Sequence, residues 1–224
     1  DPTPQTVAVG EKVTKPADVD VTGHKFLGWT TDKEGKTTWD FEQDTMPDKD
    51  ITLYAQYEIN SYKVKFDANT GTGTMTDQSI AFGEFEKLKA NEFKKENATF
   101  EGWAESSTAT TVAYEDGASF TMSKAEDVTL YAVWKTNAYT VKFDMQGFGD
   151  DPTPQTVAVG GKVIEPTKVD VTGYNFKGWT TDKEGTTLWI FGTGTMPANV
   201  MTLYAQYETN SYTVTFDFKN GDKN

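Results

Sequence analysis

The densest group of side chains capable of chemistry is an acidic run between residues 39 and 50. Its five acids are Asp40, Glu42, Asp44, Asp48 and Asp50. Alternating carboxylates can bind Ca²⁺ or act as a general acid and base. The chain repeats this stretch at residues 189–200, where all five acids are replaced while the Trp, Phe and Met-Pro framework stays. A solvated acidic face is therefore the preferred interpretation. A calcium site over Asp40–Asp50 is the alternative, although the run lacks the glycine of an EF-hand loop.

Histidine chemistry depends on one residue, His24, because the chain has no other histidine and no cysteine. The lack of cysteine excludes disulfides, thiolate metal sites and a cysteine nucleophile, and a catalytic zinc site usually needs two or three histidines. The repeated copy has Tyr174 in place of His24, which favours a half-buried aromatic position. Gly71 and Gly73 precede no helix start and do not form a phosphate loop. We therefore expect no catalytic residue, no cofactor, no metal ion and no enzymatic activity.

The tryptophans allow two interpretations. Trp29, Trp103 and Trp179 each follow a glycine at one fixed place in a repeating pattern, which predicts core packing. Trp39 and Trp189 are the candidate ligand contacts, because exposed rings of this kind can stack on a sugar or a partner. Tyr114 is their counterpart in the middle of the chain. Packing in the core or at a junction is preferred for Trp39 and Trp189, with a glycan or a host-surface protein as the alternative partner.

Composition limits the partners further. The chain has 224 residues and a net charge of −13, which disfavours binding to nucleic acid phosphates and electrostatic attachment to anionic lipid. Its apolar runs are shorter than the ~20 residues of a transmembrane helix, so no membrane insertion is expected. No basic and apolar leader opens the sequence, so we expect a signal peptide to be absent or already removed.

Internal repetition organises the chain. The ten residues DPTPQTVAVG at Asp1–Gly10 return at Asp151–Gly160, and about 43 of the first 62 positions are identical in the two copies. A divergent version with the same landmarks lies between them. The predicted repeats are 1–59, which lacks its first strand, 60–136, and 137–209, with residues 210–224 starting a further, unfinished repeat.

The repeats read as β-structure. In Tyr62–Phe66 the apolar residues alternate with lysines, as in a half-buried strand, and Thr and Tyr are frequent in such runs. We expect about five short strands in each repeat, with at most a helical turn or two in Gly83–Glu96. The predicted core residues are Trp29, Trp103, Trp179, Phe66, Phe143, Leu53, Leu130 and Leu203.

The ordered motifs resemble the Listeria–Bacteroides repeat, the family that includes the B repeat of internalin-type surface proteins. In the last repeat they stand at Tyr139–Asp144, Val157–Gly160, Gly173–Trp179, Thr195–Pro197 and Thr202–Tyr207. The middle repeat departs at Asn97–Phe100, without the Gly-Tyr start, and at Phe120–Met122, without the proline. The resemblance implies a mostly β fold of small β-grasp, ubiquitin-like modules in extracellular, cell-wall-attached proteins of Gram-positive bacteria, without enzymatic activity. Since no LPxTG-type sorting motif is present, we expect the chain to be a fragment of a larger surface protein.

Two functional hypotheses follow. The first is an elongated stalk that presents or spaces an adhesive domain and aids adhesion, because the short links between repeats favour stiffness. The second is a module that binds carbohydrate or a host receptor through repeated aromatics.

The strand Tyr212–Asp217 is nearly the one missing before Asp1. If the Tyr-x-Val-x-Phe strand opens each repeat, this tail is a spare strand that can pair into the first repeat of a neighbouring molecule, head to tail. If that strand closes each repeat, the chain holds three complete repeats and nothing is left over.

Overall fold

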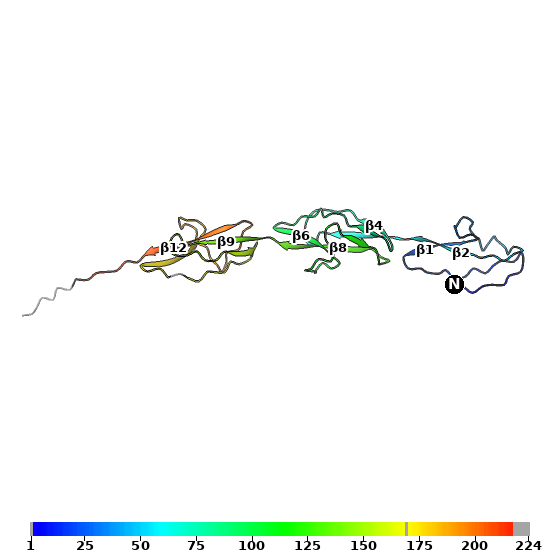
Figure 1. The fold of residues 1–224 in the computed structure, drawn as a ribbon, viewed down its shortest axis with the longest axis horizontal. Coiled ribbons are helices and arrows are strands. Elements are labelled where there is room, and N and C mark those ends of the chain that lie inside the picture. Colours follow the sequence, from blue (N-terminus) through cyan, green and yellow to red (C-terminus); the bar gives the residue numbers. More distant parts are fainter. Residues whose placement is uncertain (1, 169, 217–224) are drawn as a thin grey trace, which may run out of the picture. The chain divides into compact units, whose positions relative to one another are not determined.

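The computed structural model describes residues 2–168 and 170–216, with elements labelled in Figure 1. All regular elements in this part of the chain are β-strands, which confirms the prediction of a mostly β fold. Gly83–Glu96 contains β5 (Phe85–Lys87) and loop, without the helical turn that we considered. The described residues contain no helix that could cross a membrane. Two compact units are distinguished, one with the first and second repeats and one with the third repeat and Asn97–Thr99.

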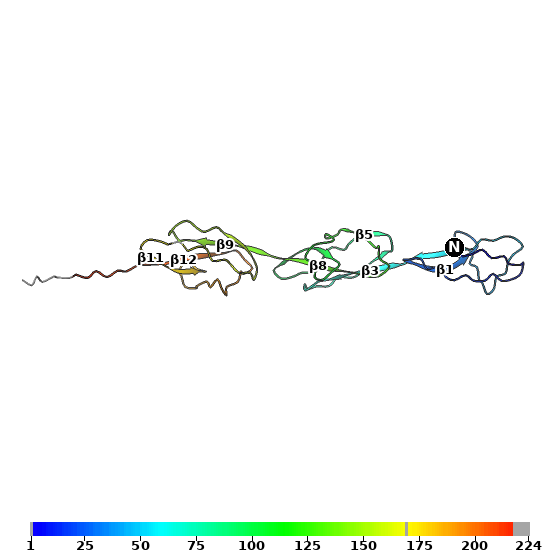
Figure 2. The same cartoon turned by 90° about the horizontal axis from the view of Figure 1, so that it is seen from below.

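The second repeat holds six strands within the described residues. They are β3 (Ser61–Asp67), β4 (Gln78–Ala81), β5, β6 (Ala98–Ala104), β7 (Ser119–Thr121) and β8 (Val128–Thr136). Four of them form a sheet in the order β4-β3-β8-β6, and β5 pairs with β7. Strand β3 is antiparallel to β4 and parallel to β8, with Val64 opposite Val128; β3 and β8 are labelled in Figure 2.

The third repeat keeps the main sheet with four strands. They are β9 (Ala138–Asp144), β10 (Gln155–Ala158), β11 (Tyr174–Thr180) and β12 (Met201–Thr209), in the order β10-β9-β12-β11. Strand β9 lies between β10, to which it is antiparallel, and β12, to which it is parallel. The Tyr-x-Val-x-Phe strand therefore opens a repeat and pairs with its last strand. The alternative phase, in which this strand closes the repeat before it, is wrong.

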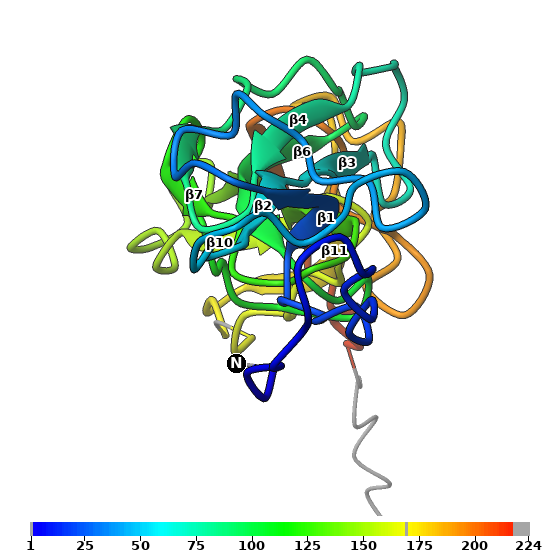
Figure 3. The same cartoon turned by 90° about the vertical axis from the view of Figure 1, so that its right-hand side faces the viewer.

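The first repeat has two strands in its described residues, β1 (His24–Thr30) and β2 (Tyr54–Ile59), which pair antiparallel. They lie side by side in Figure 3. The strand numbers of two, six and four differ from the expected five per repeat. The first repeat has the fewest strands in its described residues.

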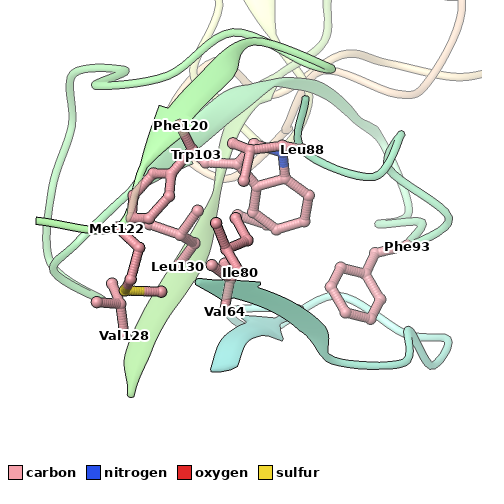
Figure 4. Close-up of a cluster of buried hydrophobic side chains, with 10 residues drawn as sticks. Val64, Ile80, Leu88, Phe93, Trp103, Phe120, Met122, Val128 and Leu130 are labelled. Atoms are coloured by element: carbon pink, nitrogen blue, oxygen red, sulfur yellow. The ribbon is translucent and has the colours of Figure 1, made fainter. Parts of the chain in front are cut away.

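A buried tryptophan follows a glycine in each repeat, and in the first and third repeats that glycine lies at a β-bulge. Register shifts occur between Phe26 and Gly28 and between Phe176 and Gly178. The glycines at these bulges have φ of 129° and 123°, a region that side-chain-bearing residues avoid. In the second repeat Trp103 is fully buried among Val64, Leu130 and other apolar side chains (Figure 4).

Most of the predicted core residues are buried. Trp29, Trp103, Trp179, Phe143, Leu130 and Leu203 have at most 8% of their surface exposed. Phe66 is partly buried against the core of the second repeat. Leu53 differs, because it is only half-buried although Leu203 occupies the same position of the third repeat.

Successive repeats are joined through single asparagines. Asn60 alone separates β2 from β3, and Asn137 alone separates β8 from β9. The Asn60 N–H donates to the Gly23 carbonyl, and the Asn60 carbonyl accepts from the Phe82 N–H, both at 2.9 Å. Asn137 makes the equivalent bonds to the Asn97 carbonyl (2.8 Å) and the Val159 N–H (2.9 Å). Each link between strands is thus one residue long, shorter than the four residues that separate Tyr57 from Tyr62 and Trp134 from Tyr139. Both the N–H and the carbonyl of each linking asparagine are hydrogen-bonded.

Candidate functional site: an open groove in the first repeat

The first repeat contains a groove of about 850 Å³. Two segments of the chain form its sides. The first runs through Pro2–Gln5 and Val7, and the second is Ile51–Ala55. Trp29 and Met46 also line it. Both sides of the groove therefore come from segments whose counterparts in the third repeat flank β9.

The groove occupies the position that β9 has in the third repeat. In the third repeat, Val141 of β9 pairs with Gln155 of β10 and with Met201 of β12. The corresponding residues of the first repeat are Gln5 and Ile51, which lie outside any strand. A strand requires a hydrogen-bonded neighbour, and without the middle strand neither segment has one in this sheet.

Identical sequences on the two repeats differ in structure for this reason. Gln155–Ala158 forms β10, whereas the same four residues at 5–8 form no strand. In the same way β12 starts at Met201, but β2 starts only at Tyr54, three residues later in the aligned copy. The difference cannot be a matter of local propensity, because the local sequence is almost the same.

Burial changes in the same places. Met196, Leu203 and Ala205 are at most 1% exposed in the third repeat, while their counterparts Met46, Leu53 and Ala55 are only half-buried. Val163 is 3% exposed, and its counterpart Val13 is also half-buried. Within residues 2–57 the buried apolar side chains are Trp29 and Trp39. The groove is thus apolar surface that a strand covers in the other repeats.

The carboxyl-terminal segment carries the matching strand sequence. Tyr212, Val214 and Phe216 are 84%, 73% and 80% exposed, and residues 210–216 form no strand. In Figure 1 this orange-to-red segment follows β12 in an extended path. Asp217, the last residue of the predicted strand, lies outside the described residues.

The acidic run builds a turn. The Asp44 carboxylate accepts from the Asp40 N–H, and the Asp40 carboxylate accepts from the Glu42 N–H, both at 2.8 Å. In the third repeat Ile190 replaces Asp40, and its carbonyl accepts from the N–H groups of Thr193 and Gly194. The same turn therefore forms without acids. Across the described residues no cluster of three or more acidic or histidine side chains could hold a metal ion, so nothing in the geometry favours the calcium alternative.

His24 occupies an aromatic position, as expected. Its half-buried ring lies edge-on to Tyr57 and Phe82, with centroids 6.4 and 6.3 Å apart. Tyr174, its counterpart, packs on Phe148 at 4.9 Å and is 38% exposed. Both side chains thus pack against neighbouring aromatic rings.

Trp39 and Trp189 pack inside their repeats. Trp39 is 8% exposed, and Trp189 is partly buried against the core of the third repeat. The Nε1 atoms of both are buried, so the polar edge of each indole is turned away from a ligand. The Tyr114 N–H donates to the Trp103 carbonyl (3.0 Å), just as the Trp39 N–H donates to the Trp29 carbonyl (2.8 Å). This shared bond confirms Tyr114 as the counterpart of Trp39 in the second repeat. This packing favours the structural interpretation over a ligand platform.

The segment GWTTDKEG, identical in the first and third repeats, forms a structural turn, as the turn signal Asp-Lys-Glu-Gly within it predicts. The Asp182 carboxylate accepts from the Thr186 and Thr187 N–H groups at 2.8 and 2.9 Å. These bonds stabilise the ionised form and lower the pKa of Asp182. The Gln206 amide donates to buried Thr180 (2.8 Å). Asp32, Thr30 and Gln56 repeat the arrangement.

Three β-rich segments in tandem, each with a Gly-Trp pair whose tryptophan is buried, define a repeat protein. The family model of the Listeria–Bacteroides repeat domain matches residues 1–56, 62–133 and 139–206. The chain belongs to this family.

Relatives span nearly the whole chain. A putative Gly-rich membrane protein of Evansella cellulosilytica is 35% identical over 214 residues, which cover 96% of this chain and 24% of that protein. Internalin H of Listeria monocytogenes is 38% identical over 205 residues, which cover 92% of this chain and 23% of that protein. A putative membrane protein of Evansella cellulosilytica is 32% identical over 208 residues, which cover 90% of this chain and 30% of that protein. The chain thus spans less than a third of the length of the curated relatives it matches.

Proposed function

We propose that the chain is a structural repeat segment of a bacterial cell-surface protein, extracellular and attached to the cell wall, that spaces an adhesive domain from the envelope. The observation that carries this proposal is the presence of three family repeats joined by one residue each, at Asn60 and Asn137. The names of the relatives, an internalin and two membrane proteins, support an envelope location.

The shortness of the links supports a spacer. A flexible linker owes its reach to several residues without fixed partners. Asn60 and Asn137 are instead single residues with both backbone groups hydrogen-bonded. Around Asn60, Phe82 also packs edge-on to His24 and Tyr62, at 6.3 and 6.4 Å. Repeats connected in this way share stability with their neighbours.

The described side chains support a role without catalysis. Asp40 and Asp44, the best acid–base candidates, are engaged in capping their own turn. His24 packs among aromatic rings.

The strand order supports the β-grasp assignment of the repeats. In the second and third repeats, the first strand lies parallel to the last strand and antiparallel to the strand that follows it.

Small-angle X-ray scattering, extrapolated to infinite dilution, tests the spacer. A radius of gyration well above the ~17 Å of a compact 224-residue globule is expected. Inserting a flexible Gly-Gly-Ser-Gly segment after Asn137 is the matched control, because it keeps all repeats and removes only the short link. It should broaden the distribution of interatomic distances. A compact parent, or a parent as flexible as the insertion variant, would contradict the spacer function.

A further inference from the structure

We propose that the parallel pairing of the first and last strands in the second and third repeats, closed at one end by an amide side chain, resists tension along the chain. The inference rests on the proposed spacer function and deepens it, since a spacer is pulled whenever the domain that it holds is bound. It gives a mechanical role to Asn69 and Gln146, two residues outside the repeated motifs.

Tension enters and leaves the second repeat through its first and last strands. Asn60 precedes the first residue of β3, and Asn137 follows the last residue of β8. A pull along the chain therefore draws β3 toward its own start and β8 toward its own end, whichever way the neighbouring repeats are oriented. Because the two strands are parallel, this pull slides them past each other. In the third repeat β9 and β12 are also parallel and are loaded in the same way.

The pairing offers four registered positions that oppose the sliding. Residues 64–67 of β3 pair with 128–131 of β8, and residues 141–144 of β9 pair with 201–204 of β12. The bonds of a parallel ladder are evenly spaced, so sliding loads them together and not one after another. The valine that starts each ladder on the first strand is fully buried. The bonds beside it thus lie in a low-dielectric environment, where hydrogen bonds are stronger.

An amide side chain closes each ladder just beyond its last pair. The Asn69 Nδ2 group donates to the Ala132 carbonyl at 2.9 Å, and the Gln146 Nε2 group donates to the Ala205 carbonyl at 2.8 Å. Ala132 and Ala205 are the next residues of β8 and β12 after the paired positions. The two amides therefore make the same bond to the last strand, although their side chains differ in length. We call this bond the amide latch.

The backbone of both latch residues is held in an unusual conformation. Asn69 and Gln146 have φ of 45° and 53°, in the left-handed region that residues with a Cβ atom rarely adopt. The carboxylates of Asp67 and Asp144 each accept from the N–H two residues later, at 2.7 Å. A costly conformation persists only where surrounding interactions hold it. The bond to the last strand is an interaction of this kind that both divergent repeats share.

The second repeat adds bonds at both ends of its ladder. The Asp127 carboxylate, just before β8, accepts from the Lys63 N–H at 2.9 Å and forms an ion pair with Lys65 at 2.9 Å. Beyond the other end, the Trp134 Nε1–H donates to the Ala68 carbonyl at 2.8 Å. The third repeat has a valine at the place of Asp127 and a tyrosine at that of Trp134. We therefore expect the second repeat to withstand the larger force.

Single-molecule force spectroscopy on the full chain tests the pairing, with introduced cysteines as attachment points because the chain has none. Ser61→Cys with Thr136→Cys loads β3 and β8 in opposite directions along their length. Ser61→Cys with Glu126→Cys instead pulls apart the neighbouring starts of the same two strands, so that their bonds break in turn. All three positions are exposed. The first pair should unfold the second repeat at a force several times higher than the second pair. Equal forces would overturn the load-bearing role of the pairing.

Asn69→Gly tests the latch when the repeat is pulled through residues 61 and 136. Glycine accepts the positive φ and removes the amide, so unfolding at constant force should become about tenfold faster. Thr70→Gly is the matched control, because Thr70 also has a positive φ, of 71°, and its hydroxyl accepts from Lys95. It should unfold at the parent rate. Asn69→Gln should do the same, since Gln146 makes the latch in the third repeat.

The third repeat provides an independent repetition of this test. Gln146→Gly, pulled through Ala138→Cys and Thr209→Cys, should also unfold faster than its parent. Chemical denaturation without load checks that each variant is folded. The latch would be overturned by an Asn69→Gly chain that unfolds no faster than Thr70→Gly, or by an Asn69→Gln chain that unfolds as fast as Asn69→Gly.

Failure of this inference is distinct from failure of the spacer function. A chain with the expected large radius of gyration but equal unfolding forces in the two pulling directions would keep the spacer and overturn the load-bearing role. A compact chain would overturn the spacer, and the difference between the two pulling directions would still be measured within the second repeat alone.

Discussion

Trp179 shows at residue scale why a Gly-Trp pair recurs in every repeat. The bulge at Gly178 turns the next side chain into the core, where Trp179 is 4% exposed and its ring lies 5.2 Å from that of Phe143. Trp29 in the first repeat is 8% exposed and lines the open groove. The two tryptophans therefore occupy the same position in differently filled cores.

Trp179→Ala should destabilise the third repeat by about 3–5 kcal/mol, because a large ring is lost from a closed core. Trp29→Ala should cost less, since part of its surroundings is already groove. Calorimetric melting of each variant measures the difference. A Trp179→Ala chain that melts within about one degree of the parent would contradict a structural role for this residue.

Asp182 and Asp32 should make stability depend on pH in acid. Hydrogen bonds from backbone N–H groups lower the pKa of both carboxyls in the folded chain. Their contribution is therefore complete above the unfolded-state pKa of about 3.9 and is lost as the pH falls through the lower folded-state pKa.

The Asp32→Asn/Asp182→Asn double variant should accordingly melt at a lower temperature than the parent at neutral pH. The two melting temperatures should converge as the pH falls below about 4. Asp48→Asn is the control, because its exposed counterpart in the third repeat is Ala198. A constant gap between parent and double variant down to pH 2 would refute this assignment.

At the scale of elements, the start of β1 is coupled to the repeat that follows it. Gly23 has a φ of 74°, and a Cβ atom there would lie 2.1 Å from the Phe82 ring. Gly173, at the same position of the third repeat, has a φ of 83° but no atom within 4 Å of such a Cβ. Both positions therefore need a residue that tolerates a positive φ. Only Gly23 must also lack a Cβ atom, because the Phe82 ring lies against it.

Gly23→Ala should therefore lower the melting temperature more than Gly173→Ala in dilute solution. Both substitutions strain a left-handed residue, at about 1 kcal/mol, and only the first forces Phe82 to move. Adding Phe82→Ala to Gly23→Ala should bring the cost of the glycine substitution closer to that of Gly173→Ala. Equal losses from the two single substitutions would show that the Phe82 contact contributes nothing.

For the molecule as a whole, the first repeat should be the least stable part. Its Met46, Leu53 and Ala55 are half-buried where their third-repeat counterparts are buried, and a smaller buried apolar area means less stabilisation. Opening of a local segment is measured by amide exchange.

The amides of residues 51–57 should exchange faster than those of residues 201–207. The two segments differ only at Ile51 and Met201, so intrinsic exchange rates are nearly matched. Mass spectrometry of the corresponding peptides provides the comparison. Equal protection would mean that the lower burial of Met46, Leu53 and Ala55 does not weaken the repeat.

The sequence by itself determined the repeats, the β class and most of the core. Alternation in Tyr62–Phe66 and the fixed Gly-Trp spacing reflect local geometry and burial, which are readable from one chain when it presents the pattern three times. Comparison of the acidic run with residues 189–200 also separated side chains that the fold needs from those that it tolerates.

Only the tertiary structure decided the phase of the repeat, because a period carries no origin. The parallel pairing of β9 with β12 places the Tyr-x-Val-x-Phe strand at the start of its repeat. The tertiary structure also decided that residues 5–8 form no strand while the same four residues at 155–158 do. A strand is completed by hydrogen bonds to a neighbour distant in sequence, and β9 is that neighbour for residues 155–158.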